Sequence, residues 1–314
     1  QQLSLRDISQ KALQQLVADN MAEITAQPAY QMLQETGKMR ATQHYLAKVS
    51  EILAVNMQRA ARVNHAQPKA VERLFGFPNR QSLPALVVST PQATVHLRGK
   101  IDRLDSQDPS QVYGTIIDYK SNGKHFDWGQ AYDGRQMQLL TYWQAAQLSA
   151  EQLGIEAIGG AFFAKIAPEK LTIKDFKGDV RAMLRGEIKP EQFKYRGLFI
   201  SEPAYIDSLE TLAEGEGSQF YQLKKKANGE LYANSDVILP EDFELLLKRN
   251  LDNIQRASAA ILSGDFPLSP AEGGLQFTPF TDVLRFDRAL GDQYKSNTPK
   301  NKSDILKLLK ADEE

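Results

Sequence analysis

The chain contains 314 residues, of which 42% are hydrophobic and 25% are charged, and this composition is typical of a globular protein with a sizeable core. No run of about 18 apolar residues occurs, and the start at Gln1 does not resemble a signal peptide, which excludes a membrane-spanning segment. The absence of cysteine excludes disulfides and thiolate-held metals, and it fits a cytoplasmic protein.

The formal net charge is −1, so any contact with nucleic acid has to come from local basic patches. Most lysine-rich stretches are solvated surface, and a charge run alone is a weak sign of DNA binding. Because the chain does not begin with Met, we expect it to be a piece of a longer protein. The candidate basic residues are Lys165, Lys170, Lys174, Lys177, Arg181, Arg185 and the run Lys224, Lys225 and Lys226.

Residues 1–66 are expected to form an N-terminal helical segment. Apolar residues recur at helical spacing over residues 4–25 and again over residues 39–63. Pro28 and Pro68 interrupt the pattern after each stretch, which predicts two helices and a turn between them.

Residues 67–170 are expected to form an α/β core. Short apolar stretches separated by Pro, Gly, Asn and Asp predict strands, and the glycines of the last strand are expected to allow close packing against the helix before it. The predicted strands span residues 71–77, 86–89, 94–104, 112–119 and 155–166, and the predicted helix spans residues 128–153.

Residues 171–238 are rich in Gly, Lys and Glu, and we expect an insertion with short elements and mobile loops. Residues 239–314 are expected to form a C-terminal helix and a docking tail. The helix should run from Pro240 to Leu262, because proline favours a first turn and Gly264 favours a helix end. From Ser296 the charged tail is expected to be frayed, with a possible helix over residues 303–309.

The most informative segments are LRGKIDRLD, which contains Asp102, and YGTIIDYKS, which contains Asp118 and Lys120. Alternation along a strand places Asp118 and Lys120 on one face, and Asp102 can lie beside Asp118 on the neighbouring strand. Two converging carboxylates repel each other unless a cation lies between them, and oxygen ligands favour Mg²⁺ or Mn²⁺. The simpler alternative is a turn acid at Asp102 and a surface ion pair between Asp118 and Lys120.

A third feature follows on the predicted helix. Gln138 and Tyr142 in QLLTY are four residues apart, so their side chains project from one helical face. Alternatively, they are polar residues on an amphipathic helix that buries Leu139, Leu140 and Trp143.

The GKID, DYKS and Gln-x-x-x-Tyr motifs, in this order, resemble the PD-(D/E)XK nuclease superfamily and within it the RecB-like and AddB-like nuclease domains. The later segments KYRGLFISEPAYIDSLE, LPEDFELLLKRN and VLRFDRALGDQYK are similar to the C-terminal part of AddB/RexB subunits of bacterial helicase-nucleases. The resemblance runs from Val71 to Tyr294. It implies an α/β fold with a central mixed sheet flanked by helices, an N-terminal helical segment and a C-terminal helical extension.

The resemblance implies a Mg²⁺-dependent DNA exonuclease domain, with Mn²⁺ able to substitute, that acts in double-strand-break end resection and recombinational repair. Its substrate would be a single strand fed from an unwound duplex end, and its partner an AddA/RexA-like helicase-nuclease subunit. Asp102, Asp118 and the backbone carbonyl of Tyr119 would hold the metal, and Lys120 would orient the nucleophilic water or neutralise the transition state. Gln138 and Tyr142 would support the site, with Lys165 and Arg135 as weaker candidates for phosphate contact.

The sequence departs from this family at its iron–sulfur site. Leu275, Thr278 and Leu284 stand where cysteines would be, so no iron–sulfur cluster is expected, as in RexB-like subunits that lack the cluster. We expect residues 275–286 to dock on the core through apolar side chains instead, with Phe277, Leu284 and Phe286 largely buried.

A second departure is the upstream His or Glu ligand of the family, for which the chain has no convincing match. His44 is better explained as a surface residue, Glu72 as an edge residue, and His125 as a loop residue. The ligand is therefore expected outside this chain, which would leave the metal site incomplete and the isolated piece weak or inactive. Two alternatives remain open, a non-catalytic DNA-binding and assembly module and a stand-alone endonuclease, of which the C-terminal resemblance disfavours the second.

Overall fold

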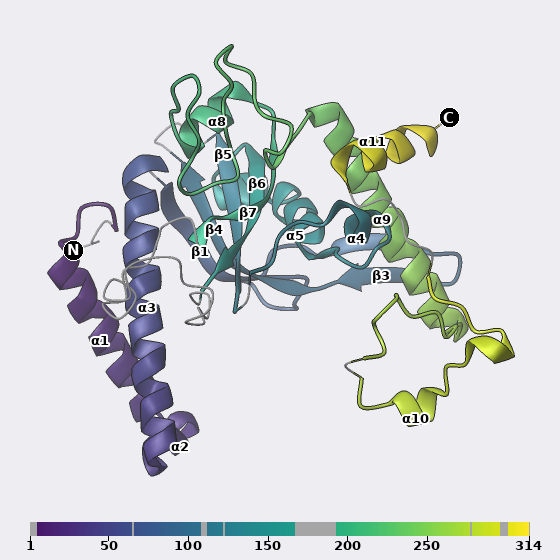
Figure 1. Ribbon diagram of the computed structural model, residues 1–314, viewed down its shortest axis with the longest axis horizontal. Coiled ribbons are helices and arrows are strands. Elements are labelled where there is room, and N and C mark those ends of the chain that lie inside the picture. The colour runs from purple at the N-terminus through teal and green to yellow at the C-terminus, as the bar shows by residue number, and fades with distance from the viewer. Residues whose placement is uncertain are drawn as a thin grey trace.

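A six-stranded mixed sheet forms the centre of the computed structural model (Figure 1). Its strands follow the order β1-β4-β5-β6-β7-β8, with β5–β6 and β7–β8 parallel and the other pairs antiparallel. The strands are β1 (Ala66–Phe75), β4 (Gly99–Gln107), β5 (Tyr113–Lys120), β6 (Ala157–Lys165), β7 (Arg196–Ile200) and β8 (Val237–Ile238). The structure describes residues 5–64, 66–107, 112–121, 123–166, 193–276, 278–295 and 301–313.

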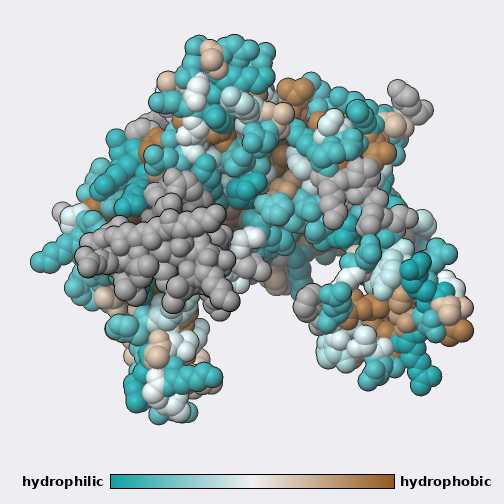
Figure 2. Space-filling model, viewed as in Figure 1, coloured by the Kyte–Doolittle hydropathy of each residue, from teal (hydrophilic) through white to brown (hydrophobic). Residues whose placement is uncertain are grey.

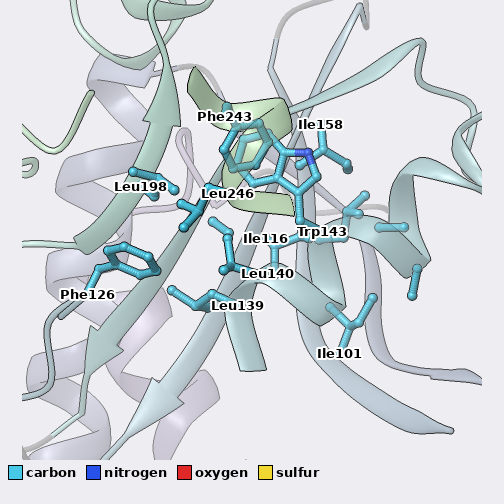
Figure 3. Packing of buried hydrophobic residues seen from close by; sticks show 14 of the residues in the cluster. Ile101, Ile116, Phe126, Leu139, Leu140, Trp143, Ile158, Leu198, Phe243 and Leu246 are labelled. Carbon is cyan, nitrogen blue, oxygen red and sulfur yellow. The ribbon is translucent and has the colours of Figure 1, made fainter. Parts of the chain in front are cut away.

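Helices cover one face of this sheet through a large apolar core. Two of them, α5 (Gln138–Gln147) and α9 (Pro240–Ser263), bring Trp143 and Phe243 together with their ring centres 4.3 Å apart (Figure 3). Figure 3 shows Leu139, Leu140 and Leu246 pointing into the same cluster. The expected α/β architecture, a central mixed sheet flanked by helices, is therefore confirmed.

The other face carries an aromatic cluster that includes Phe199 and Tyr205. Tyr205 belongs to α8 (Pro203–Leu209) and lies so close to Gly159 and Gly160 of β6 that a side chain at either glycine would collide with its ring. The glycines of β6 thus allow close packing against α8, and not against the preceding helix as the sequence had suggested. An insertion of short elements and loops was expected over residues 171–238, and the described part of this range, residues 193–238, contributes two strands to the main sheet.

The N-terminal residues form two long antiparallel helices that extend from the sheet (Figure 1). Ser9 caps the first helix, and the buried Gln58 of the second donates a hydrogen bond of 2.6 Å to the carbonyl of Ile8. The helical prediction for this segment is confirmed. These elements are α1 (Gln10–Ala26), η1 (Pro28–Tyr30), α2 (Met32–Glu35) and α3 (Gly37–Asn64).

Two predicted elements are divided. The stretch 94–104 was expected to be one strand, but it contains one strand of a separate two-stranded sheet and the start of β4. The predicted helix 128–153 is divided into three helices. The first break follows from Gly134, whose φ of +75° does not continue a right-handed helix. The elements concerned are β2 (Leu86–Ser89), β3 (Thr94–Leu97), α4 (Trp128–Tyr132), α5 and α6 (Ala150–Leu153).

The C-terminal tail differs most from expectation. Residues 278–295 stand away from the core (Figure 1), and apolar side chains lie on their surface (Figure 2), so the predicted docking of residues 275–286 is wrong. Val283 is 77% exposed and Leu284 37% exposed, Phe286 is only partly buried, and Phe277 lies outside the described residues. This segment contains α10 (Thr281–Leu284) and η3 (Arg288–Leu290).

The last helix, α11 (Lys302–Ala311), provides the anchor in place of that segment. It contacts α4 and α9, and it buries Ile305 and Leu309 in the main core, so this part of the tail is not frayed. Asn301 caps its first turn by accepting a hydrogen bond from the backbone N–H of Asp304. In the described part of the chain, no helix is both long and apolar enough to cross a membrane.

Candidate active site

The two motif carboxylates meet at the adjoining ends of β4 and β5. The register pairs Arg103 with Ile117, and its continuation places Asp102 opposite Asp118. The backbone N–H of Tyr119 donates a hydrogen bond of 2.9 Å to Oδ2 of Asp102, which fixes this carboxylate beside the end of β5. Both acids therefore lie where the strand alternation predicts them.

Asp118, Lys120 and Gln138 form a closed polar cluster on the face of the sheet covered by α5. Lys120 Nζ lies 2.5 Å from Oδ2 of Asp118 and donates a hydrogen bond of 3.0 Å to Oε1 of Gln138. Gln138 Nε2 donates to Oδ1 of Asp118 at 2.8 Å and to the hydroxyl oxygen of Tyr142 at 3.1 Å. Gln138 and Tyr142 thus share one helical face, as their spacing predicts, and this face is turned towards the acids, as the family resemblance implies.

The environment of Asp118 is unusual for a carboxylate. Its side chain is almost fully buried, and burial raises the pKa of Asp118, while Lys120 opposes the increase and the negative charge of Asp102 adds to it. Oδ2 is buried and has no hydrogen-bond partner among the described residues, but it forms an ion pair with the Lys120 ammonium. A buried carboxylate is costly unless a cation stabilises it, and here the Lys120 ammonium does so.

The available donors are suited to a hard divalent cation. The carboxylates of Asp118 and Asp102 and the carbonyl of Tyr119 offer oxygen donors, and Mg²⁺ is commonly held by one or two carboxylates together with water and substrate phosphate. No cluster of three or more His, Cys, Asp or Glu side chains that could hold a metal occurs within the described residues.

The other acids and histidines considered from the sequence do not join this site. Glu72 lies on the edge strand β1 with a largely exposed side chain, and it forms an ion pair with Lys100. Its φ of +51° is rare for a residue other than glycine and marks an irregularity in β1. His44 and His125 are exposed, and His65 lies outside the described residues.

The basic candidates differ in their position relative to the site. Lys165 is the partner of Lys120 in the parallel β5–β6 register, so it lies next to the site. Arg135 is exposed and forms an ion pair of 2.9 Å with Asp133. Lys225 and Lys226 form ion pairs with Asp207 and Glu230, and the Lys224 ammonium lies over the Tyr232 ring. The remaining candidates, Lys170, Lys174, Lys177, Arg181 and Arg185, lie outside the described residues.

A buried ion pair supports the site from the opposite face, and the motifs of the sequence did not reveal it. Arg103 and Asp105 lie on the face of β4 opposite to Asp102. Two Arg103 nitrogens donate hydrogen bonds of 2.6 Å to the two Asp105 oxygens, one to each. The third guanidinium nitrogen donates a hydrogen bond of 3.3 Å to the hydroxyl of Tyr119. The available signal was the pair of opposite charges two residues apart in GKIDRLD, which strand alternation places on one face.

Known proteins share this sequence pattern. Residues 3–273 match the family model described as the PD-(D/E)XK nuclease superfamily. Three curated proteins, each named as a subunit of an ATP-dependent helicase/deoxyribonuclease, are similar to nearly the whole chain. They are 99% identical over 314 residues in Leuconostoc citreum (strain KM20), 55% over 308 in Leuconostoc mesenteroides subsp. mesenteroides and 32% over 332 in Oenococcus oeni. The alignments cover 100%, 98% and 98% of this chain but 27%, 26% and 28% of those proteins, so the chain spans about a quarter of their length.

Proposed function

This chain belongs to the PD-(D/E)XK nuclease superfamily, and we propose that it is the part of a bacterial helicase-nuclease subunit that hydrolyses phosphodiester bonds of DNA. The observation that carries the proposal is the convergence of the buried Asp118 carboxylate with Lys120 and with a second carboxylate, Asp102, at the end of β5.

Asp102, Asp118 and the carbonyl of Tyr119 would hold a Mg²⁺ ion, or Mn²⁺ in its place. When bound, such an ion activates water and stabilises negative charge on the phosphate. The hydrogen bond from the Tyr119 N–H keeps the Asp102 carboxylate turned towards the end of β5. The buried pair of Arg103 and Asp105 restrains Tyr119 from the other side of the sheet.

Lys120 would act on the reacting phosphate or on the attacking water. Its ammonium is restrained by two neighbours, the carboxylate of Asp118 and the amide oxygen of Gln138. A cation fixed in this way can stabilise charge in the transition state with little reorganisation. Gln138 would in turn hold Oδ1 of Asp118, so that Oδ2 would be shared between the Lys120 ammonium and the metal, and Tyr142 would hold the Gln138 amide.

In the whole protein, this activity would serve the resection of double-strand breaks for recombinational repair. The names of the curated relatives, which describe part of a helicase and deoxyribonuclease, support this setting. We propose a single DNA strand from an unwound duplex end as substrate, an AddA/RexA-like helicase-nuclease as partner, and the cytoplasm as compartment. This chain provides no cysteine ligand for an iron–sulfur cluster.

A second candidate is a non-catalytic DNA-binding and assembly module. The observation that favours it is the small ligand set, since the described residues contain no group of three metal-binding side chains. Against it stands the cluster of Asp118, Lys120 and Gln138 beside Asp102, which combines two acids and a lysine as metal-dependent hydrolysis of a phosphodiester requires.

The decisive experiment uses the full-length protein with its helicase partner. Asp118→Ala should abolish Mg²⁺-dependent cleavage of one DNA strand and leave ATP-dependent unwinding intact, because the carboxylate has no part in the motor. The exposed Asp282 provides a matched control, and Asp282→Ala should cleave as the wild type does. Undiminished cleavage by the Asp118→Ala complex would refute the nuclease assignment, and a wild type that binds DNA without cutting it would favour the second candidate.

A further inference from the structure

Lys124 lies in the loop between β5 and α4, next to the candidate site, and the mechanism above gives it no role. Its side chain is partly buried, and its ammonium lies 5.0 Å from the centre of the Phe163 ring. The Lys120 ammonium lies 5.5 Å from the same ring, and Phe163 is the partner of Asp118 in the β5–β6 register. The Phe163 ring thus places Lys124 beside both the acid and the lysine of the site.

Lys124 differs from Lys120 and Arg196 in having no ion pair among the described residues, although its charge, like that of Lys120, acts on the Asp118 carboxylate. Lys120 forms an ion pair with Asp118, and Arg196, which pairs with Phe163 across β6 and β7, forms one with Asp236. Among the described residues, Lys124 has neither an ion pair nor a hydrogen bond. The aromatic ring contributes only a weak attraction and accepts no conventional hydrogen bond, so the three N–H donors of this ammonium stay available.

The surrounding charge also favours an anion. Lys165 lies opposite Lys120 in the β5–β6 register, and its side chain runs along Gly123, directly before Lys124. Three ammonium groups therefore converge at the ends of two neighbouring strands. The Asp118 carboxylate already faces Lys120, and a phosphate group of a DNA strand would supply a second anion with acceptor oxygens for the Lys124 ammonium.

We propose that Lys124 is a DNA-binding residue that holds a phosphate of the substrate strand next to the scissile phosphate, with the Phe163 ring as the platform that positions it. The inference rests on the proposed function, because it places the strand across Asp118 and Lys120. Lys124 contributes binding and register of the strand, whereas Lys120 contributes to the reaction itself.

The test measures binding of the 314-residue chain to a short fluorescein-labelled oligothymidylate by fluorescence anisotropy, with Ca²⁺ in place of Mg²⁺, over a series of KCl concentrations. Lys124→Met keeps the length of the side chain but removes its charge, and it should weaken binding about fivefold to tenfold. The slope of log affinity against log salt should fall in magnitude by about 0.7, the value for one lost phosphate contact with a single strand. Lys124→Arg should restore both the affinity and the slope.

The matched control is Lys38→Met, which removes the same charge from an exposed position at the start of α3. This control should retain the wild-type slope. Lys124→Met with the affinity and slope of the control would overturn the inference, and so would a wild-type chain with no measurable affinity at low salt. An unchanged thermal unfolding curve of Lys124→Met would show that the fold is intact, and the salt slope is a measurement that a purely structural role would not alter.

Failure of this inference can be distinguished from failure of the proposed function. In the full-length complex, cleavage by the Asp118→Ala variant would refute the nuclease assignment whatever Lys124 does. Loss of cleavage in Asp118→Ala together with wild-type binding and a wild-type KM in Lys124→Met would refute only the role of Lys124. The expected result is a KM increase of about fivefold to tenfold in Lys124→Met with little change in kcat.

Discussion

Removal of Arg103 is expected to destabilise the protein strongly, because this residue neutralises a buried carboxylate. Its side chain is 6% exposed and that of Asp105 is 3% exposed, and two contacts of 2.6 Å join them. Arg103→Met leaves the Asp105 carboxylate buried without a partner, which costs about 3–5 kcal/mol. The double variant Arg103→Met/Asp105→Leu removes both charges and should lie within about 1 kcal/mol of the wild type.

The loss should also depend on pH. Burial raises the pKa of Asp105 above its ordinary value of 3.8, and Arg103 opposes this increase, so the pKa rises further when Arg103 is removed. A carboxyl group with a raised folded-state pKa stabilises the folded protein while it is protonated, and this contribution is lost as the pH rises through that pKa. The destabilisation by Arg103→Met should therefore be smaller at about pH 5 than at about pH 8.

Urea unfolding followed by circular dichroism measures these free energies. The control Lys48→Met removes an exposed ion pair with Glu51 and should change the free energy of unfolding by less than about 1 kcal/mol. A single variant as stable as the wild type would refute the reasoning. A double variant as unstable as Arg103→Met would also refute it, because the cost would then come from lost packing and not from the unpaired charge.

Two further predictions concern the C-terminal anchor and the support of Asp118. Ile305→Ala removes a fully buried side chain of α11 and should lower the free energy of unfolding in urea by about 3 kcal/mol. The control Val283→Ala, at a side chain that is 77% exposed, should lower it by less than about 0.5 kcal/mol. Equal effects of the two substitutions would contradict the anchoring role of α11. Gln138→Ala removes the amide that forms hydrogen bonds with Asp118 and Lys120, and it should lower the cleavage rate of the full complex about tenfold to hundredfold. Tyr142→Phe should have a smaller effect, because the Gln138 amide remains. A Gln138→Ala variant that cleaves at the wild-type rate would show that Gln138 is not part of the site.

The arrangement of the candidate site could be predicted because it depends on local periodicity. Strand alternation places Asp118 and Lys120 on one face, and helical spacing places Gln138 and Tyr142 together on one side of their helix. The antiparallel β4–β5 pair then brings Asp102 to Asp118. That the helix turns this side towards the acids follows from the family resemblance and not from the spacing.

The features that could not be predicted depend on contacts between distant segments. Lys124 is positioned by Phe163, which lies 39 residues later in the sequence. The two residues become neighbours only because β5 and β6 pair in parallel. The apolar residues around Leu284 suggested a docking segment, but Ile305 and Leu309 of α11 occupy the core instead. Competition between two apolar segments for one surface is a question of packing, which periodicity does not answer.

The central claim is that Asp102 and Asp118 hold a divalent cation, and calorimetric titration of this chain with Mn²⁺ tests it most directly. The account predicts a binding heat for the wild type that is lost in Asp118→Ala and in Asp102→Ala. The control Asp282→Ala, at an exposed position in α10, should bind as the wild type does. An Asp118→Ala variant that binds Mn²⁺ with the affinity of the wild type, or a wild type that binds none, would contradict the account.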